Sequence, residues 1–176
     1  VCGASVSNVD VEEASRRNIP VINVVGRNAI AVAEFTIGLM LAESRHIARG
    51  HASLMDGKWR KAYSCEPCEI EGKDVGLVGF GAIAQTVARK LSSFGCSILF
   101  YDPYVDVSPT IPARKVSLEE LLQTSDFVSI HCRLTEGTKG LIGAKELSLM
   151  RPSAYIINTG RAEIIDSEAL YNALRA

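Results

Sequence analysis

A glycine-rich pattern, Gly79-x-Gly81-x-x-Ala84, directly follows an apolar run and directly precedes a helical pattern. A strand, a tight turn and a helix in this order can bind the pyrophosphate of a dinucleotide. Gly79 permits the tight turn, and Gly81 lets the backbone approach the phosphates without a Cβ in the way. The helix that begins near Ala82 and Ile83 offers free N–H groups and the positive end of its dipole. The pattern predicts a pyrophosphate site.

Asp102 stands 23 residues beyond Gly79, at the end of the next apolar run. A carboxylate at the end of the second strand accepts hydrogen bonds from the ribose hydroxyls of adenosine. The same carboxylate would repel a 2′-phosphate, so the two signals together favour NAD over NADP as the cofactor. The alternative is a domain of the same fold that binds another adenosine ligand, or none.

Two later apolar runs also end in polar residues. His131 follows residues 127–130, and Asn158-Thr159-Gly160-Arg161 follows residues 154–157. Ligands of open parallel sheets bind beyond the carboxyl ends of the strands. At that edge, Arg161 could pair with a substrate carboxylate and polarise a carbonyl as hydride arrives. The residues alone leave open whether His131 is structural or catalytic, and whether Arg161 is a surface residue or binds substrate.

Strands that alternate with helices must position these residues. Near-continuous apolar runs predict strands that are covered on both faces. The expected strands are residues 75–78, 97–101, 127–130 and 154–157. The expected helices are residues 82–94, residues 118–123, a segment that ends at Met150 before Pro152, and a segment from Ser167 onward. The alternation predicts an α/β fold with a doubly wound parallel sheet.

The N-terminal part of the chain has a different pattern. We expect a short helix near residues 9–14, a strand at residues 21–25 and one long helix from Asn28 to Met55. The first half of the long helix is apolar on every side, which indicates burial in a core or an interface. Within it, Glu34 is interpreted as a paired carboxylate, whereas His46 and His51 are interpreted as surface residues.

Composition and charge exclude several classes of protein. The 176 residues are 47% hydrophobic and 22% charged, with a formal net charge of −1. This charge does not favour nucleic acid or an anionic membrane as a partner. The longest apolar stretch is shorter than a membrane span, and we identify no signal peptide, so we expect a cytoplasmic protein.

The five cysteines occur at irregular spacing, which argues against a disulfide framework. Cys65 and Cys68 have the spacing of a redox pair or of half a zinc site. A structural zinc needs four ligands, and no second pair of Cys or His stands at a matching distance. We therefore expect no metal and interpret this pair as part of an exposed loop.

Taken together, several segments resemble the D-isomer-specific 2-hydroxyacid dehydrogenases, a family that includes D-3-phosphoglycerate dehydrogenase and the glyoxylate and hydroxypyruvate reductases. The resemblance extends over essentially the whole chain. The motifs that carry it are Gly26-Arg27-Asn28 with Val32-Ala33-Glu34, residues 72–81, residues 125–131 with Leu134-Thr135, and residues 150–161 with Asp166. The pattern departs from the family at Ala82, Ala84, Arg133 and Ala162.

The resemblance implies an NAD-binding Rossmann domain and reversible hydride transfer between NAD and a small 2-hydroxy or 2-keto acid, most like the phosphoglycerate dehydrogenase branch. It implies that Arg161 binds the substrate and polarises its carbonyl. The family's general acid/base His and its partner Glu match no residue here. We expect both beyond Ala176, so these 176 residues alone should not catalyse turnover. The other implied site positions are His131, Thr159 and Gly160 at the cofactor, and Gly3 and Ala4 in the substrate loop.

The resemblance also implies a domain plan. Residues 1–27 would be the tail of a flavodoxin-like substrate domain, and residues 28–176 a Rossmann domain whose last strands are missing. The long helix from Asn28 would connect the two domains and form a homodimer interface. A second hypothesis comes from another class, because the same fold serves as a non-enzymatic, NAD-responsive binding module in transcriptional corepressors.

Overall fold

Five parallel strands form one sheet in the computed structural model of the chain, which describes residues 6, 8–24, 26–59, 66–106 and 111–175. The order across the sheet is β3-β2-β1-β4-β5. The strands are β1 Asp74–Val78, β2 Ser97–Tyr101, β3 Ala113–Lys115, β4 Phe127–Ile130 and β5 Tyr155–Asn158. The four predicted strands of this region are confirmed, whereas β3 is too short and polar to stand out in the sequence.

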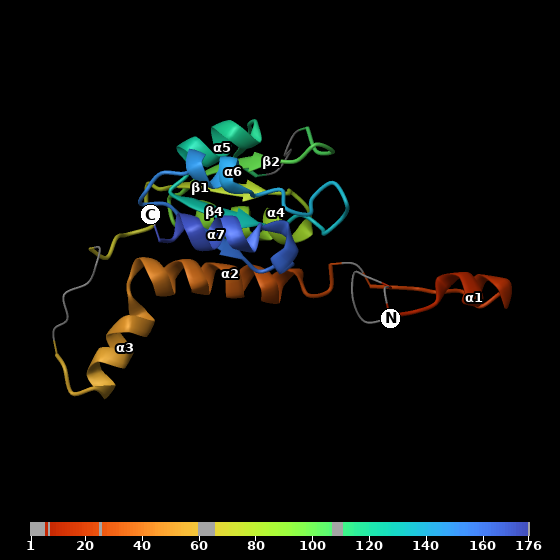
Figure 1. Cartoon of the computed structure of the whole chain (residues 1–176), viewed down its shortest axis with the longest axis horizontal. Helices are drawn as coiled ribbons and strands as arrows, with labels where there is room; N and C mark the ends of the chain where they lie inside the picture. Colours follow the sequence, from red (N-terminus) through yellow and green to blue (C-terminus); the bar gives the residue numbers. More distant parts are fainter. Residues whose placement is uncertain (1–5, 7, 25, 60–65, 107–110, 176) are drawn as a thin grey trace.

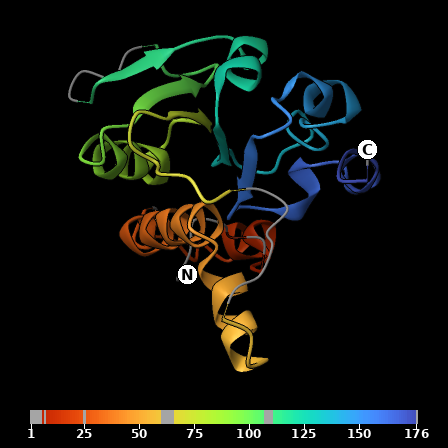
Figure 2. The same cartoon turned by 90° about the vertical axis from the view of Figure 1, so that its left-hand side faces the viewer.

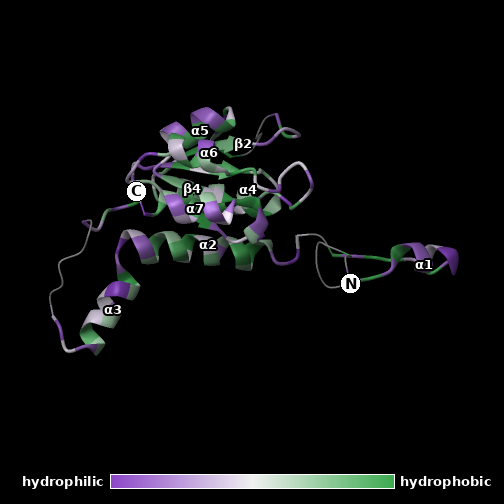
Figure 3. Ribbon diagram, viewed as in Figure 1, coloured by the Kyte–Doolittle hydropathy of each residue, from purple (hydrophilic) through white to green (hydrophobic). Residues whose placement is uncertain are grey.

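Helices cover both faces of this sheet, so the doubly wound α/β fold is confirmed (Figure 1). One face packs against α2 Ala29–Ser44 and α4 Ala82–Ser92. The other face packs against α5 Leu118–Thr124, α6 Ala144–Leu149 and α7 Ser167–Ala173. Figure 3 shows the strands between these layers mainly in the hydrophobic colour, as strands with two covered faces require.

Gly76 sets the distance between α5 and the centre of the sheet. A Cβ built at Gly76 would overlap the side chain of Leu121 and the hydroxyl of Ser125, both of which are fully buried. The neighbouring residues Val75 and Leu77 belong to the core on the opposite face, with α2 and α4. Because position 76 has no side chain, α5 can lie directly against β1.

The predicted single helix from Asn28 to Met55 is wrong, because the chain forms α2 and then a separate α3 Ile47–Met55. The break lies at His46, whose φ of 53° is left-handed and cannot continue a helix. His46 is also only 3% exposed, which corrects its interpretation as a surface residue. Turning the chain here directs α3 away from the sheet, as Figure 2 shows, and buries the imidazole. The described helices include none that could cross a membrane.

The predicted strand at residues 21–25 is also wrong as far as the structure describes it, since residues 21–24 form no strand and Val25 lies outside the described residues. A strand needs neighbouring strands, and all five strands of the sheet come from residues 74–158. Residues 21–24 lie on an arm that extends away from the sheet and carries the predicted short helix, α1 Val11–Arg16 (Figure 1). No residue of α1 is buried.

The close approach at Gly76 can be tested by substitution. We expect Gly76→Ala to lower the free energy of unfolding by about 1–3 kcal/mol, because the added methyl overpacks the contact with Leu121. The matched control is Gly38→Ala in α2, where a Cβ meets nothing within 4 Å. Replacing a glycine within a helix should raise stability by about 1 kcal/mol. Urea denaturation measures both, and a Gly76→Ala variant as stable as the parent would refute the packing argument.

Candidate functional site

The carboxyl ends of four strands lie level, and this register brings the predicted site residues to one edge. Val78 of β1 is paired with Tyr101 of β2 and with Ile130 of β4, and Ile130 is paired with Asn158 of β5. The residues that follow these positions are Gly79, Asp102, His131 and Thr159. Four positions chosen from separate sequence signals therefore come next to one another along the edge where parallel sheets bind ligands.

The turn after β1 requires glycine at its first position. Gly79 has φ 89°, and a Cβ built there would lie 2.6 Å from the backbone N of Cys132. Its own N–H donates to the Tyr101 carbonyl oxygen at 2.7 Å, which ties the turn to β2. The side chain of Gln85 closes the turn from the other side, donating from Nε2 to the Phe80 carbonyl oxygen at 3.0 Å.

The start of α4 is suited to an anionic group. Gly81 is the N-cap residue, no side chain caps the helix, and a Cβ built on Gly81 meets nothing within 4 Å. The first N–H groups of an uncapped helix, here those near Ala82 and Ile83, attract phosphate oxygens. Ala84, which replaces the third glycine, is fully buried in the core and packs the helix onto the sheet. The residues thus fit a dinucleotide pyrophosphate.

Asp102 is held beside this turn by two backbone donors. Its Oδ2 accepts from the Phe80 N–H at 2.7 Å, and its Oδ1 accepts from the Tyr104 N–H at 2.8 Å. A carboxylate has about four lone-pair sites, so each oxygen keeps one for a further donor such as a ribose hydroxyl. The contact with Phe80 joins the end of β2 to the glycine turn and was not predicted from the sequence.

His131 is a neutral imidazole in this structure. Burial lowers its pKa from 6.5 to about 4, and a hydrogen bond of 2.9 Å links its Nε2 to the Ser129 hydroxyl. Ser129 is fully buried, two residues earlier on the same face of β4, and this alternation is the one sequence signal that could have identified it. A group that is uncharged at neutral pH is a poor proton donor there, which favours a cofactor-side role over general acid catalysis.

The loop after β5 is braced by its own side chains. The Asn158 Oδ1 accepts from the Gly160 N–H, and its Nδ2 donates to the Arg161 carbonyl oxygen, both at 2.9 Å. Thr159 is linked to Thr36 of α2 by a hydrogen bond of 3.0 Å between their hydroxyls. Arg161 is exposed, and no ion pair in the described part of the chain engages its guanidinium. Its charge is therefore available to an anionic substrate.

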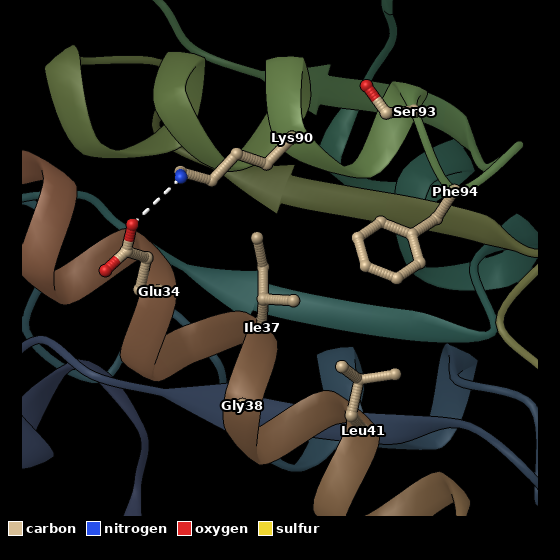
Figure 4. Close-up of a pocket in the computed structure, with 7 residues that line it drawn as sticks. All are labelled: Glu34, Ile37, Gly38, Leu41, Lys90, Ser93 and Phe94. Carbon is tan, nitrogen blue, oxygen red and sulfur yellow. Dashed lines mark hydrogen bonds and ion pairs between the residues drawn. The ribbon is translucent and has the colours of Figure 1, made fainter.

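A pocket lies away from this edge, between α2 and α4 (Figure 4). It has a volume of about 430 Å³, and the apolar side chains of Ile37, Leu41 and Phe94 line much of it. At its mouth, Glu34 pairs with Lys90 Nζ at 3.0 Å, which confirms the interpretation of Glu34 as a paired carboxylate. Because the pocket is far from the strand ends, we do not assign the chemistry to it.

Two predicted site positions and one cysteine of the Cys65/Cys68 pair fall in parts of the chain that the structure does not describe. Gly3, Ala4 and Cys65 lie outside the described residues. Cys68 is a free, partly buried thiol, and the described residues contain no group of three or more His, Cys, Asp or Glu side chains arranged for a metal ion. Cys132 lies beside the glycine turn, and burial raises the pKa of its thiol, which keeps it protonated and unreactive.

A comparison with known families decides the nature of this edge. The model of the D-isomer specific 2-hydroxyacid dehydrogenase NAD-binding domain matches residues 37–176, which include every described site position from Gly79 to Arg161. The chain belongs to the D-isomer specific 2-hydroxyacid dehydrogenase family. The cofactor of this domain is NAD, as Asp102 and the glycine turn predict.

Individual members of the dehydrogenase family match nearly the whole chain. Hydroxypyruvate reductase of Thermotoga maritima is 43% identical over 169 residues, which cover 96% of this chain and 55% of that protein. D-3-phosphoglycerate dehydrogenase of Methanocaldococcus jannaschii is 40% identical over 98% of this chain and 33% of that protein. The crystal structure of D-lactate dehydrogenase with NAD+ from Lactobacillus jensenii matches with a TM-score of 0.87 and 29% identity, over 98% of this chain and 52% of that one. The chain thus spans a third to about half of the length of these relatives.

The depressed pKa of His131 predicts a pH-dependent stability. The unfolded chain takes up a proton near pH 6.5 that the folded chain excludes until about pH 4, so stability is complete above pH 6.5 and falls as the pH drops between these values. The loss amounts to at most about 3 kcal/mol. Urea denaturation from pH 4 to 7 measures it, and His131→Gln, which keeps a partner for Ser129, should flatten the profile. If the stability of the parent and of His131→Gln falls equally as the pH drops, His131 is not the group responsible.

Proposed function

We propose that the chain is the nucleotide-binding half of an NAD-dependent 2-hydroxyacid dehydrogenase, most like phosphoglycerate dehydrogenase. The observation that carries this proposal is the common row of Gly79, Asp102, His131 and Thr159 at one sheet edge. The names of the relatives support a small 2-keto acid as the substrate, since they include hydroxypyruvate reductase and D-3-phosphoglycerate dehydrogenase.

Each residue of the site then has a defined role in binding or catalysis. When bound, NAD accepts or returns the hydride. The N-terminus of α4 would hold the pyrophosphate, and Asp102 would accept hydrogen bonds from the adenosine ribose hydroxyls while it accepts the Phe80 N–H. Arg161, on the braced loop after β5, pairs with the substrate carboxylate and polarises the adjacent carbonyl.

We propose that the general acid for the reaction, a histidine in this family, is supplied from outside these 176 residues. The chain has three histidines. His46 is buried at the junction of α2 and α3, His51 lies on α3, and His131 is neutral with a lowered pKa. We therefore expect the chain to bind NADH without oxidising it when a panel of 2-keto acids is added. Absorbance at 340 nm measures turnover, and steady NADH loss dependent on one keto acid would overturn this part of the proposal.

We further propose that residues 1–27 belong to a second, substrate-binding domain and that α2 and α3 contribute to a homodimer interface. Helix α1 and its arm bury little against the sheet, which supports the domain boundary. Ile30, Phe35 and Met55 are between 62% and 75% exposed, and apolar surface of this kind favours contact with a second copy. A monomer by sedimentation equilibrium at micromolar concentration would count against the dimer.

The cofactor preference rests on Asp102 and can be tested directly. NADH should bind at least about 10-fold more tightly than NADPH, because Asp102 attracts ribose hydroxyls and repels a 2′-phosphate. Asp102→Asn should lower NADH affinity about 10-fold and narrow the preference. Asp106→Asn is the matched control, because this exposed carboxylate pairs with Lys115 away from the glycine turn. Fluorescence titration reports each affinity, and unchanged selectivity in Asp102→Asn would contradict the assignment.

A further inference from the structure

A buried hydroxyl on α2 contacts the loop that carries the expected substrate arginine. Thr36 is fully buried, and its Oγ1 lies 2.8 Å from the Val32 carbonyl oxygen and 3.0 Å from Thr159 Oγ1. The two threonines are 123 residues apart in the sequence, and α2 packs against β5, which ends just before Thr159. This contact links the helix to the row of site residues.

Counting protons fixes the direction of these hydrogen bonds. A threonine hydroxyl has one proton and can accept at its two lone pairs. The Val32 carbonyl can only accept, and two oxygens at 2.8 Å repel each other unless a proton lies between them, so Thr36 donates to Val32. Thr36 then has no proton left for Thr159. The hydroxyl of Thr159 must donate to Thr36.

This direction determines what Thr159 can offer a ligand. With its only proton committed to Thr36, the Thr159 oxygen presents lone pairs and no donor. The surrounding loop holds it in place, because Asn158 bonds to both the Gly160 N–H and the Arg161 carbonyl oxygen. A rigid acceptor favours a ligand group that donates a hydrogen bond and disfavours one that can only accept, since two facing acceptors leave a desolvated polar atom unpaired.

We infer that Thr36 is a positioning residue of the cofactor site, which sets the Thr159 hydroxyl as a hydrogen-bond acceptor for a donor group on the nicotinamide nucleoside. This inference rests on the proposed placement of NAD along the strand ends. Two groups of that nucleoside have the required chemistry, the carboxamide NH2 and the ribose hydroxyls. Thr36 itself touches no ligand and acts only through Thr159.

Four variants separate this role from a structural one. Thr36→Val removes the hydroxyl and keeps the shape, and we expect it to weaken NADH binding about 3- to 10-fold, as expected for one lost hydrogen bond. Thr36→Ser keeps the hydroxyl and should bind within about twofold of the parent. Thr159→Val should weaken binding about as much as Thr36→Val, and the double variant should be no worse than Thr159→Val alone. The control is Ser92→Ala, since Ser92 also bonds back to a helical carbonyl, that of Ala88, but at the far end of α4.

The donor is identified with two dinucleotide analogues in the same fluorescence titration. Reduced 3-acetylpyridine adenine dinucleotide has a methyl ketone in place of the carboxamide, so the effects of Thr36→Val and Thr159→Val should disappear with it if the amide is the donor. If they persist there and disappear with an analogue that lacks the nicotinamide ribose 2′-hydroxyl, that hydroxyl is the donor. Either result supports the inference.

Three results would overturn it. These are parental affinity for NADH in Thr36→Val, a Thr36→Ser variant as weak as Thr36→Val, and additive losses in the double variant. Circular dichroism and melting temperature show whether each variant is folded, and Thr159→Val, at a partly exposed position outside the core, tests the contact from the side of the loop. Failure of the parent chain to bind NADH would remove the proposed function itself, and this inference with it. If the parent chain binds NADH and the Thr36 variants bind it equally well, the proposed function stands and this inference alone is refuted.

Discussion

At the centre of the sheet edge, the turn after β1 passes against the chain that leaves β4, with room for hydrogen but not for carbon at Gly79. A Cβ there would lie 2.6 Å from the Cys132 backbone nitrogen. This close approach lets the glycine turn sit level with the ends of β2, β4 and β5. The turn directs the start of α4 toward the edge, and the carboxylate of Asp102 and the ring of His131 follow on either side. The arrangement of the site follows from this one contact between two backbones.

Much of the fold could be predicted because parallel strands buried on both faces leave a simple mark in the sequence. The runs that became β1, β2, β4 and β5 are apolar and end in glycine or polar residues. The wrong predictions of secondary structure arose where that apolar pattern is missing or misleading. Ala113–Lys115 joins the sheet through backbone hydrogen bonds with charged side chains outward, whereas residues 21–24 are rich in β-branched residues yet pair with none of the five described strands. The break before α3 has neither glycine nor proline, and it coincides with the burial of His46.

The site could be predicted as a set of positions but not as a set of contacts. The glycine spacing and the number of residues between Gly79 and Asp102 are local properties of the sequence, so the sequence alone reveals them. The hydrogen bonds from Phe80 to Asp102 and between Thr36 and Thr159 join residues 22 and 123 positions apart, and no local pattern indicates them. The neutrality of His131 likewise comes from burial, which only the folded chain supplies. These contacts turn a list of polar residues into a site with defined donors and acceptors.

Asp102 both sets the cofactor preference and holds the glycine turn, and this combination limits how the preference can be redesigned. A designer who wants to admit a 2′-phosphate would remove the negative charge, but the same carboxylate accepts the N–H groups of Phe80 and Tyr104. Asparagine keeps one acceptor oxygen for two donors, and alanine keeps none. Either exchange therefore loosens the glycine turn at the same time as it removes the charge that repels a 2′-phosphate. A successful exchange would pair the new residue with a replacement acceptor for the Phe80 N–H, placed on the segment after β2 rather than on the turn itself.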